Sequence, residues 1–368
     1  MKPNDFDVVS MRTELHEIPE LGFQEKKTSD YVAAKLTELG LKPIRNVGGT
    51  GVVAYIDGTE PGPTVMLRAD MDALPFKIDG KDVCIHACGH DSHTAMGLAT
   101  AARLVGNVKK GRVKLLFQPA EETLFGALKC IEDGVLDDVD YAFSAHVRPI
   151  QDIPDGTVCA AVRHTASTFC WVDIHGEVAH ASRPHLGKSV AEAAVLATNA
   201  VNSLWVNPNK AWSAKVTTLD CRSTASNIIP DKGRMCLDIR AQDNATMDEL
   251  LEKLKVAITN ACACVGCTCE ISFPGGVIPA AEYDEDLVTE VRETIKEVLG
   301  EEKLAKDCGG GGEDFHYFVQ KKPSIHAAYI GVGTGVTPGL HNPTMTMNPE
   351  SLRNGVEVLT KLVLDKVG

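Results

Sequence analysis

The spacing of hydrophobic positions differs from one stretch of the chain to another. Over 7–18 and 25–39, apolar residues recur every three to four positions, which predicts two amphipathic helices. Short apolar runs rich in β-branched or aromatic residues follow, and they predict strands over 51–56, 64–68, 113–117 and 141–145, with a further helix over 94–104. This alternation of helices and strands is typical of an α/β sheet.

The middle of the chain has another order. The pattern predicts, in turn, a strand over 168–174, a helix over 189–204, strands over 213–219 and 233–239, a helix over 246–260 and a strand over 267–273. This β-α-β-β-α-β order is ferredoxin-like. The α/β style then resumes with a helix over 284–299, a strand over 324–330 and a closing helix from Pro349. We therefore predict an outer α/β domain, formed by 1–160 and 275–368, that is interrupted by an inserted α+β domain over 161–274.

Composition and charge narrow the functional classes. Of the 368 residues, 44% are hydrophobic and 24% are charged, as in ordinary globular proteins. The net charge of −13, without a dense Lys/Arg block, makes nucleic acid an unexpected partner. An acidic N-terminus and the lack of a long apolar run predict a cytoplasmic protein without a membrane partner. In such a chain the 12 cysteines are expected to be reduced.

The densest cluster of polar residues is His86-Ala-Cys88-Gly-His90-Asp91-Ser-His93. An extended backbone would direct Cys88 and His90, two positions apart, to the same side, and thiolate and imidazole are metal ligands. The alternative is that Asp91 or Ser92 caps the following helix while the histidines face solvent. A cap explains neither Cys88 nor His90, so we favour a metal site.

Two further signals follow predicted strands. In Gln118-Pro-Ala-Glu121-Glu122, one carboxylate could bind a metal while its neighbour faces an activated water, although acids at a first helical turn also complement the helix dipole. His146 ends the strand that begins at residue 141. In open α/β sheets the carboxyl ends of the strands are where sites form.

Two aspartates and a cysteine group have weaker signals. Asp70 and Asp72 follow the strand that ends at Arg68, and they could orient ligating imidazoles or pair with that arginine.

Cys262, Cys264, Cys267 and Cys269 have the spacing of a metal-thiolate motif. Because no histidine lies nearby, we expect ordinary core or surface thiols.

Six motifs occur in an order that makes the chain recognisable. They are Asp70-Met-Asp-Ala-Leu-Pro75, His86-Ala-Cys-Gly-His-Asp-Ser-His-Thr94, Phe117-Gln-Pro-Ala-Glu-Glu122, His180-Ala-Ser-Arg-Pro-His185, Gly312-Glu-Asp-Phe315 and His341-Asn-Pro343. Together they resemble the aminoacylase/carboxypeptidase family of two-metal amidohydrolases, particularly the branch with hippurate hydrolase and the auxin-conjugate hydrolases. The resemblance implies a two-metal catalytic domain of α/β class with an inserted dimerisation or lid domain.

The resemblance also implies a ligand set and a base. The metal ligands would be Cys88, His90, Glu122, His146 and His341. Cys88 would bridge two divalent ions, with His90 and His146 on one ion and Glu122 and His341 on the other. Zinc, manganese, cobalt and nickel all suit these donors. Glu121 would be the general base that deprotonates a bridging water and then protonates the leaving amine.

The implied substrate is an N-acyl amino acid, a related small amide or a dipeptide, and the implied assembly is a homodimer or a higher oligomer. His180 would stabilise the oxyanion in the other subunit's active site, while Asn227 and Arg240 would hold the substrate carboxylate. Two departures affect the expected pocket. Only ten residues separate Pro75 from His86, and Thr123-Leu-Phe125 is more apolar than we expect for this branch.

Two other functions compete with this one. Cys88 could be the nucleophile of a cysteine hydrolase, with His90 or His93 as its base. Such an enzyme would use neither Glu121 nor His341. The chain could also be a non-catalytic metal-binding or amino-acid-binding relative, because fold alone does not establish activity.

Overall fold

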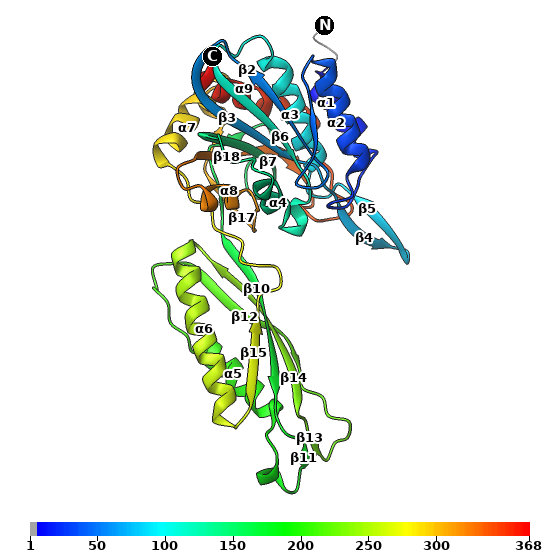
Figure 1. The fold of residues 1–368 in the computed structure, drawn as a ribbon, viewed down its shortest axis with the longest axis vertical. Coiled ribbons are helices and arrows are strands. Elements are labelled where there is room, and N and C mark those ends of the chain that lie inside the picture. Colours follow the sequence, from blue (N-terminus) through cyan, green and yellow to red (C-terminus); the bar gives the residue numbers. More distant parts are fainter. Residues whose placement is uncertain (1–5) are drawn as a thin grey trace. The chain divides into compact units, whose positions relative to one another are not determined.

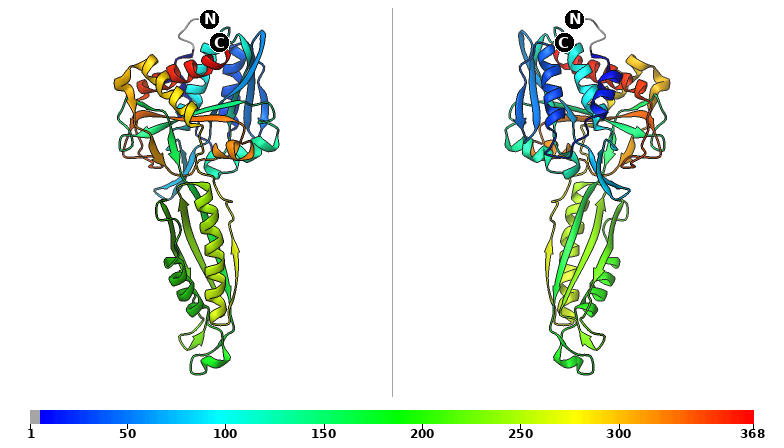
Figure 2. Two further views of the ribbon diagram at one scale, coloured as in Figure 1. Left: turned by 90° about the vertical axis from the view of Figure 1, so that its left-hand side faces the viewer. Right: turned by 90° about the vertical axis from the view of Figure 1, so that its right-hand side faces the viewer.

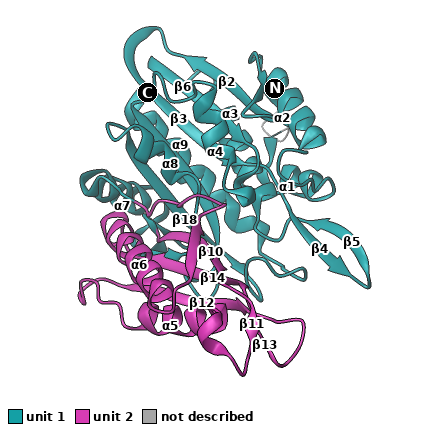
Figure 3. Cartoon of the chain, turned by 60° about the horizontal axis from the view of Figure 1, so that its bottom comes forward, with its two compact units in different colours: residues 1–163, 282–368 teal, residues 164–281 magenta. Residues whose placement is uncertain are grey.

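The computed structural model describes residues 6–368, so residues 1–5 of the N-terminal stretch considered above lie outside it. The chain forms two compact units, coloured separately in Figure 3. Unit 1 comprises Met1–Arg163 and Glu282–Gly368, and unit 2 comprises His164–Ala281. The return boundary lies after Ala281 because the segment beyond residue 274 still pairs within unit 2. Ile278 exchanges backbone hydrogen bonds with Ser167, and the Ala281 N–H donates to the His164 carbonyl over 2.9 Å.

Unit 1 contains most of the elements of the fold. Its helices are α1 (Val8–His16), α2 (Lys26–Glu38), α3 (His90–Leu104), α4 (Gly126–Glu132), α7 (Glu285–Leu299), α8 (His316–Lys321) and α9 (Leu352–Val367). Its strands are β1 (Ile44–Val47), β2 (Gly51–Asp57), β3 (Glu60–Asp70), β4 (Leu74–Ile78), β5 (Lys81–Ile85), β6 (Lys110–Gln118), β7 (Tyr141–Pro149), β8 (Val158–Cys159), β16 (Leu304–Ala305), β17 (Cys308–Gly310) and β18 (His326–Val336). Strand β9 (Val162–His164) crosses the boundary to unit 2.

The main sheet of unit 1 has eight strands in the order β1-β2-β6-β3-β7-β18-β8-β16. Alternating residues face two separate apolar cores: Val52 belongs to the core beneath α1, α2, α3, α7 and α9, whereas Val53 belongs to the core beneath α4 and α8. Figure 1 shows the helices arranged about this sheet. Because helices cover both faces of the sheet, its strands appear in the sequence as continuous apolar runs.

Parallel pairing gathers the polar motifs at one edge. Strands β6, β3, β7 and β18 pair in parallel, so their carboxyl ends lie at the same edge of the sheet. Asp70 ends β3, Gln118 ends β6, and His146 lies near the end of β7. The fold therefore brings together motifs that are dispersed along the chain.

Unit 2 is built around a four-stranded antiparallel sheet in the order β12-β14-β10-β15. Its elements are β10 (Ala166–His175), β11 (Ala179–His180), α5 (Val190–Asn202), β12 (Trp212–Asp220), β13 (Ile228–Ile229), β14 (Lys232–Ala241), α6 (Asn244–Cys264) and β15 (Thr268–Ser272). Both helices share one apolar core with the sheet. Figure 2 shows the two helices running alongside the strands of this unit. The predicted ferredoxin-like order is present.

The predicted helices and strands are present, but the pattern missed several short elements. The hairpin β4–β5 falls in a stretch for which we predicted no element, and helices α4 and α8 have only seven and six residues. Elements this short have too few turns or alternations to create a periodic signal. Among residues 6–368, no helix combines the length and apolar character that crossing a lipid bilayer requires.

Candidate metal centre

The turn that carries Cys88 and His90 differs from the extended backbone that the sequence suggested. Gly89 has a φ of 88° and precedes α3, so His90 is already the first helical residue. A Cβ at position 89 would lie 2.4 Å from Val147 Cγ2, so both the backbone angle and the close approach require glycine. Neither Asp91 nor Ser92 is the N-cap, which excludes the simple capping interpretation. The predicted helix start at residue 94 was wrong because a glycine N-cap gives a weak sequence signal.

Hydrogen bonds orient the rings of His90 and His146. His90 Nδ1 lies 3.0 Å from Asp72 Oδ1, and His146 Nδ1 lies 2.6 Å from the carbonyl oxygen of Val147. Each Nδ1 therefore carries a proton, and each Nε2 is the nitrogen that remains to bind a metal. This arrangement, in which an acceptor holds the remote nitrogen of the ring, is typical of metal-binding histidines.

Glu121 and Glu122 lie on a short 3₁₀ turn (Glu121–Thr123) directly after β6. Asp72 accepts hydrogen bonds from both of their backbone N–H groups, at 3.1 Å and 3.0 Å. Asp72 thus orients a histidine ring and the backbone of two glutamates. Of the two roles considered for Asp70 and Asp72, Asp72 orients His90, whereas Asp70 bonds both His93 and Arg68.

Two groups of ligand-type atoms share one sulfur. Atoms of Cys88, His90 and His146 lie within 4.8 Å of one another, and so do atoms of Cys88, Glu122 and His341. His341 lies in a loop and has a φ of 60° itself. Its Nε2 lies 3.3 Å from Glu122 Oε1. The structure therefore brings His341 to the cluster although nothing near it in the sequence indicated this.

The donor set fits two divalent cations. His90 Nε2 is buried and lacks a hydrogen-bond partner within the described residues, and the contact of Glu122 Oε1 with His341 is an ion pair rather than a hydrogen bond. A buried polar atom without a partner is costly, and a cation that bonds to it removes the cost. Each group offers three donors, the number of protein ligands that catalytic zinc sites use, and thiolate, imidazole and carboxylate also suit manganese, cobalt or nickel.

The pKa values of His146, Glu122 and Glu121 are shifted in different directions. Burial, with help from His93 and Arg148, holds the pKa of His146 well below its usual range, so the ring is neutral. Although burial opposes it, the contact with His341 lowers the pKa of Glu122. Burial, followed by repulsion from Glu313 and Glu122, instead raises the pKa of Glu121 well above normal. Two adjacent glutamates thus have opposite shifts, which suits one for ligation and the other for proton transfer.

A buried arginine neutralises part of the negative charge beneath the site. Arg68 donates to Asp70 over 2.5 Å and to Glu313 and Asp314 over 2.9 Å each. Its side chain has no solvent exposure. Glu121 also lies within 4.8 Å of Glu313 and Asp314. The motif that contains Glu313 and Asp314 does not reveal this role, because their partner Arg68 is more than 240 residues away in the sequence.

The two other histidines of the dense cluster are buried, and His93 has a structural role. His93 donates from Nδ1 to Asp70 over 2.6 Å and accepts from the Val147 N–H at Nε2 over 2.9 Å. Both ring nitrogens are occupied, so His93 holds the backbone beside His146. His86 is buried, and burial lowers its pKa to about 4.

The predicted site residues of unit 2 lie on its surface. His180 ends β11, and its Nδ1 accepts hydrogen bonds from the Ser182 N–H at 3.1 Å and the Ser182 hydroxyl at 2.8 Å. The proton therefore resides on Nε2, which lies 3.4 Å from Asn227 Nδ2. Arg240 bonds Asp238 through Nε and Nη2, at 2.8 Å and 2.9 Å.

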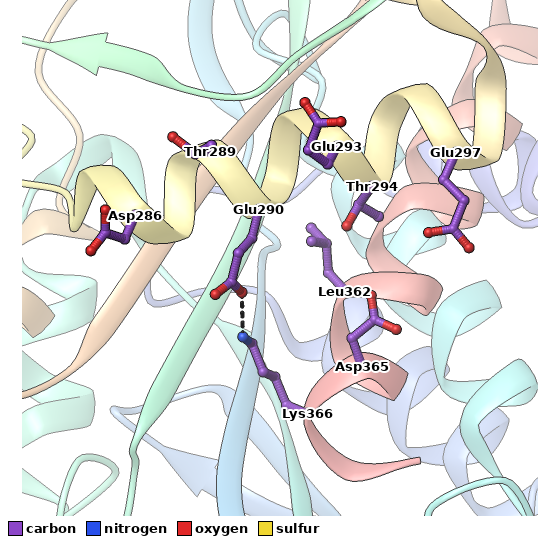
Figure 4. Close-up of a pocket in the computed structure, with 9 residues that line it drawn as sticks. All are labelled: Asp286, Thr289, Glu290, Glu293, Thr294, Glu297, Leu362, Asp365 and Lys366. Carbon is purple, nitrogen blue, oxygen red and sulfur yellow. Dashed lines mark hydrogen bonds and ion pairs between the residues drawn. The ribbon is translucent and has the colours of Figure 1, made fainter.

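The structure disfavours two other candidate centres. Cys262 and Cys267 are buried while Cys264 is exposed, and none of the four cysteines belongs to a ligand group in the part of the chain that is described. A groove of about 480 Å³ between α7 and α9 is lined by acidic side chains, with Lys366 paired to Glu290 (Figure 4). Exposed carboxylates alone do not define a metal site.

The structure gives the cysteine-hydrolase alternative little support. Burial and the nearby Glu122 raise the pKa of Cys88, whereas a nucleophilic cysteine needs a lowered one. Of the two bases considered, His93 has both ring nitrogens occupied, by Asp70 and by the Val147 N–H. His90 belongs to the same group of ligand-type atoms as Cys88.

Comparisons with known proteins agree with the resemblance stated above. The model for peptidase family M20/M25/M40 matches residues 66–365. Thermostable carboxypeptidase 2 of Saccharolobus solfataricus is 35% identical, over 89% of this chain and 86% of that protein. Hippurate hydrolase of Campylobacter jejuni is 31% identical, over 96% and 95%. A dinuclear metal-binding M20 peptidase of Bacillus subtilis has a TM-score of 0.80 and 28% identity, over 98% of this chain and 97% of that one.

Proposed function

This chain belongs to the M20/M25/M40 peptidase family and is a metallo-amidohydrolase, and we propose that it hydrolyses the amide bond of N-acyl amino acids or small dipeptides. The observation that carries the proposal is the pair of ligand groups that share Cys88, with the carboxylate of Glu121 beside them. Relatives named as a hippurate hydrolase and as a carboxypeptidase support this range of substrates.

Each of the two groups of ligand-type atoms that share Cys88 would hold one cation. Cys88 would bridge two divalent cations, with His90 and His146 on one and Glu122 and His341 on the other. When bound, the cations would lower the pKa of the attacking water and polarise the substrate carbonyl. Zinc, manganese, cobalt and nickel remain the candidates.

Glu121 would move the proton in both halves of the reaction. As the water oxygen bonds to the carbonyl carbon, Glu121 accepts a water proton, and it then delivers that proton to the amide nitrogen as the C–N bond breaks. Burial and repulsion from Glu313 raise the pKa of Glu121, which favours a group that must both take and release a proton. Asp72 fixes the position of its backbone N–H.

His180 would supply a hydrogen-bond donor for the developing oxyanion, in the active site of a partner subunit. Ser182 supports this role because its two bonds keep the proton of His180 on Nε2. Exposed apolar side chains on α5, Val195 and Leu196, support a homodimer in which unit 2 is the contact surface. Asn227, beside His180, and Arg240 are the proposed contacts of the substrate carboxylate.

Metal removal and a substrate panel test this function. Protein dialysed against a chelator should lose hydrolysis of hippurate, of N-acetyl amino acids and of dipeptides, and each divalent ion can then be added back singly. We expect activity to return at about two ions per chain. Full activity in the metal-free protein would refute the proposal, and restored binding without amine release would favour the non-catalytic alternative.

A further inference from the structure

Glu25 is a fully buried carboxylate that does not serve the helix it precedes. It is the N-cap residue of α2, yet its side chain makes no capping hydrogen bond. Glu20 accepts instead from the backbone N–H groups of Lys27 and Thr28, at 3.1 Å and 3.0 Å. Because the first turn of α2 is satisfied by Glu20, the burial of Glu25 needs another explanation.

The partners of Glu25 lie elsewhere in the chain. Its Oε1 accepts from the Ala120 N–H over 2.7 Å, across 95 residues of sequence, and its Oε2 accepts from the Thr50 hydroxyl. The two segments are in direct contact, since a Cβ on Gly22 would lie 3.1 Å from Ala120 Cα. Thr50 thus anchors one oxygen of Glu25, and the other oxygen holds Ala120.

Ala120 needs such a restraint. Its φ of 56° and ψ of 39° are left-handed, a conformation that residues with a Cβ avoid. It directly precedes Glu121, so this turn sets the direction in which the Glu121 and Glu122 side chains leave the backbone. A residue in a disfavoured conformation persists only where its surroundings hold it there.

Three buried carboxylates hold the loop 118–127. Asp72 accepts from the N–H groups of Glu121 and Glu122, and Asp314 accepts from the Ala127 N–H over 2.8 Å. Asp72 also bonds the His90 ring, and Asp314 also bonds Arg68. The two hydrogen-bond partners of Glu25 in the described residues, Ala120 and Thr50, are not ligand side chains, so its contribution to the loop can be isolated by substitution.

We propose that Glu25 is a positioning residue for Glu121: its bond to Ala120 fixes the left-handed turn and thereby aims the Glu121 carboxylate at the reacting water. The proposal rests on the proposed function of Glu121. A base displaced by about 1 Å can cost about 10²-fold in rate, so kcat depends on this turn. Glu122 shares this turn, but His341 also contacts its carboxylate, so we expect this ligand to keep its place without Glu25.

The test compares three substitutions in the metal-reconstituted protein. Glu25→Ala should lower kcat for the best substrate of the panel about 10- to 100-fold, with KM within about threefold and the metal content unchanged. Glu25→Gln keeps an amide oxygen for the Ala120 N–H and should retain kcat within about threefold. Glu20→Ala is the matched control, because it removes a carboxylate from the same helix start without touching the loop 118–127, and it should lower thermal stability but not kcat.

Hydrogen exchange separates this proposal from the function on which it rests. In Glu25→Ala, peptides covering 118–127 should take up deuterium faster than in the wild type, while in Glu20→Ala they should not. This measurement needs no turnover, so it stands even if the substrate panel fails. A Glu25→Ala protein with wild-type kcat and unchanged exchange, or an equal fall in kcat in Glu20→Ala, would overturn the positioning role.

Discussion

Cys88, His90 and His146 in unit 1 are between 1% and 6% exposed, whereas His180 and Asn227 in unit 2 lie on an exposed surface. The buried set is held by partners from its own unit, such as Asp72 and the Val147 carbonyl. Ser182 holds the ring of His180 through two hydrogen bonds to Nδ1, and the residue is exposed. Buried polar groups must be satisfied locally, while exposed ones remain available to another surface.

This difference in burial indicates where each set of residues acts. All residues of the proposed metal centre lie within unit 1, because both ligand groups and Glu121 come from its strand ends and loops. The polar residues of unit 2 form no comparable group within the described chain. We therefore expect substitutions in unit 1 to affect metal or chemistry within one subunit, and substitutions in unit 2 to act across subunits or on substrate affinity.

The largest expected effect separates ligand from base within unit 1. Glu121→Ala should keep both metals and lose about 10²- to 10⁴-fold in kcat, because general-base catalysis typically supplies that factor. Glu122→Ala should instead lose one of the two ions. Elemental analysis beside steady-state kinetics measures both, and the reverse pattern would exchange the two roles.

The next effect sharpens the contrast between the units. His180→Ala should lower kcat about 10²- to 10³-fold with its metals retained, as expected for the loss of one oxyanion donor. Mixing His180→Ala with Glu121→Ala subunits should restore about a quarter of the sites, since half of randomly paired dimers are mixed and each has one intact site. If isolated mixed dimers stay inactive, His180 does not act across the interface.

The smallest effect concerns substrate affinity in unit 2. Arg240→Gln should raise KM about tenfold for substrates with a free carboxylate and leave KM unchanged for their carboxamide analogues. Arg234→Gln is the matched control, because Arg234 lies on the same strand and makes the same two-bond contact, with Asp173. Equal KM values in the two variants would remove Arg240 from the proposed carboxylate site.

Sequence alone predicted the longer elements, and it pointed to most residues of the proposed metal centre for local reasons. In long periodic stretches such as 25–39 and 246–260, the spacing of apolar residues indicates a helix. Cys88, His90, Glu121 and Glu122 stand in short motifs next to predicted strands or helices, and the resemblance to a family assigned His146 and His341. The family match over residues 66–365 confirms that resemblance.

Tertiary structure alone decided how those residues are held. Arg68 meets Glu313 and Asp314, and Glu25 meets Ala120, across separations that leave no trace in local periodicity. The start of α3 at His90 depends on how closely Gly89 approaches Val147, a neighbour from another strand. A sequence pattern records the faces of helices and strands, because each is repeated along the chain. A hydrogen bond between two distant segments occurs once, so only the folded structure reveals it.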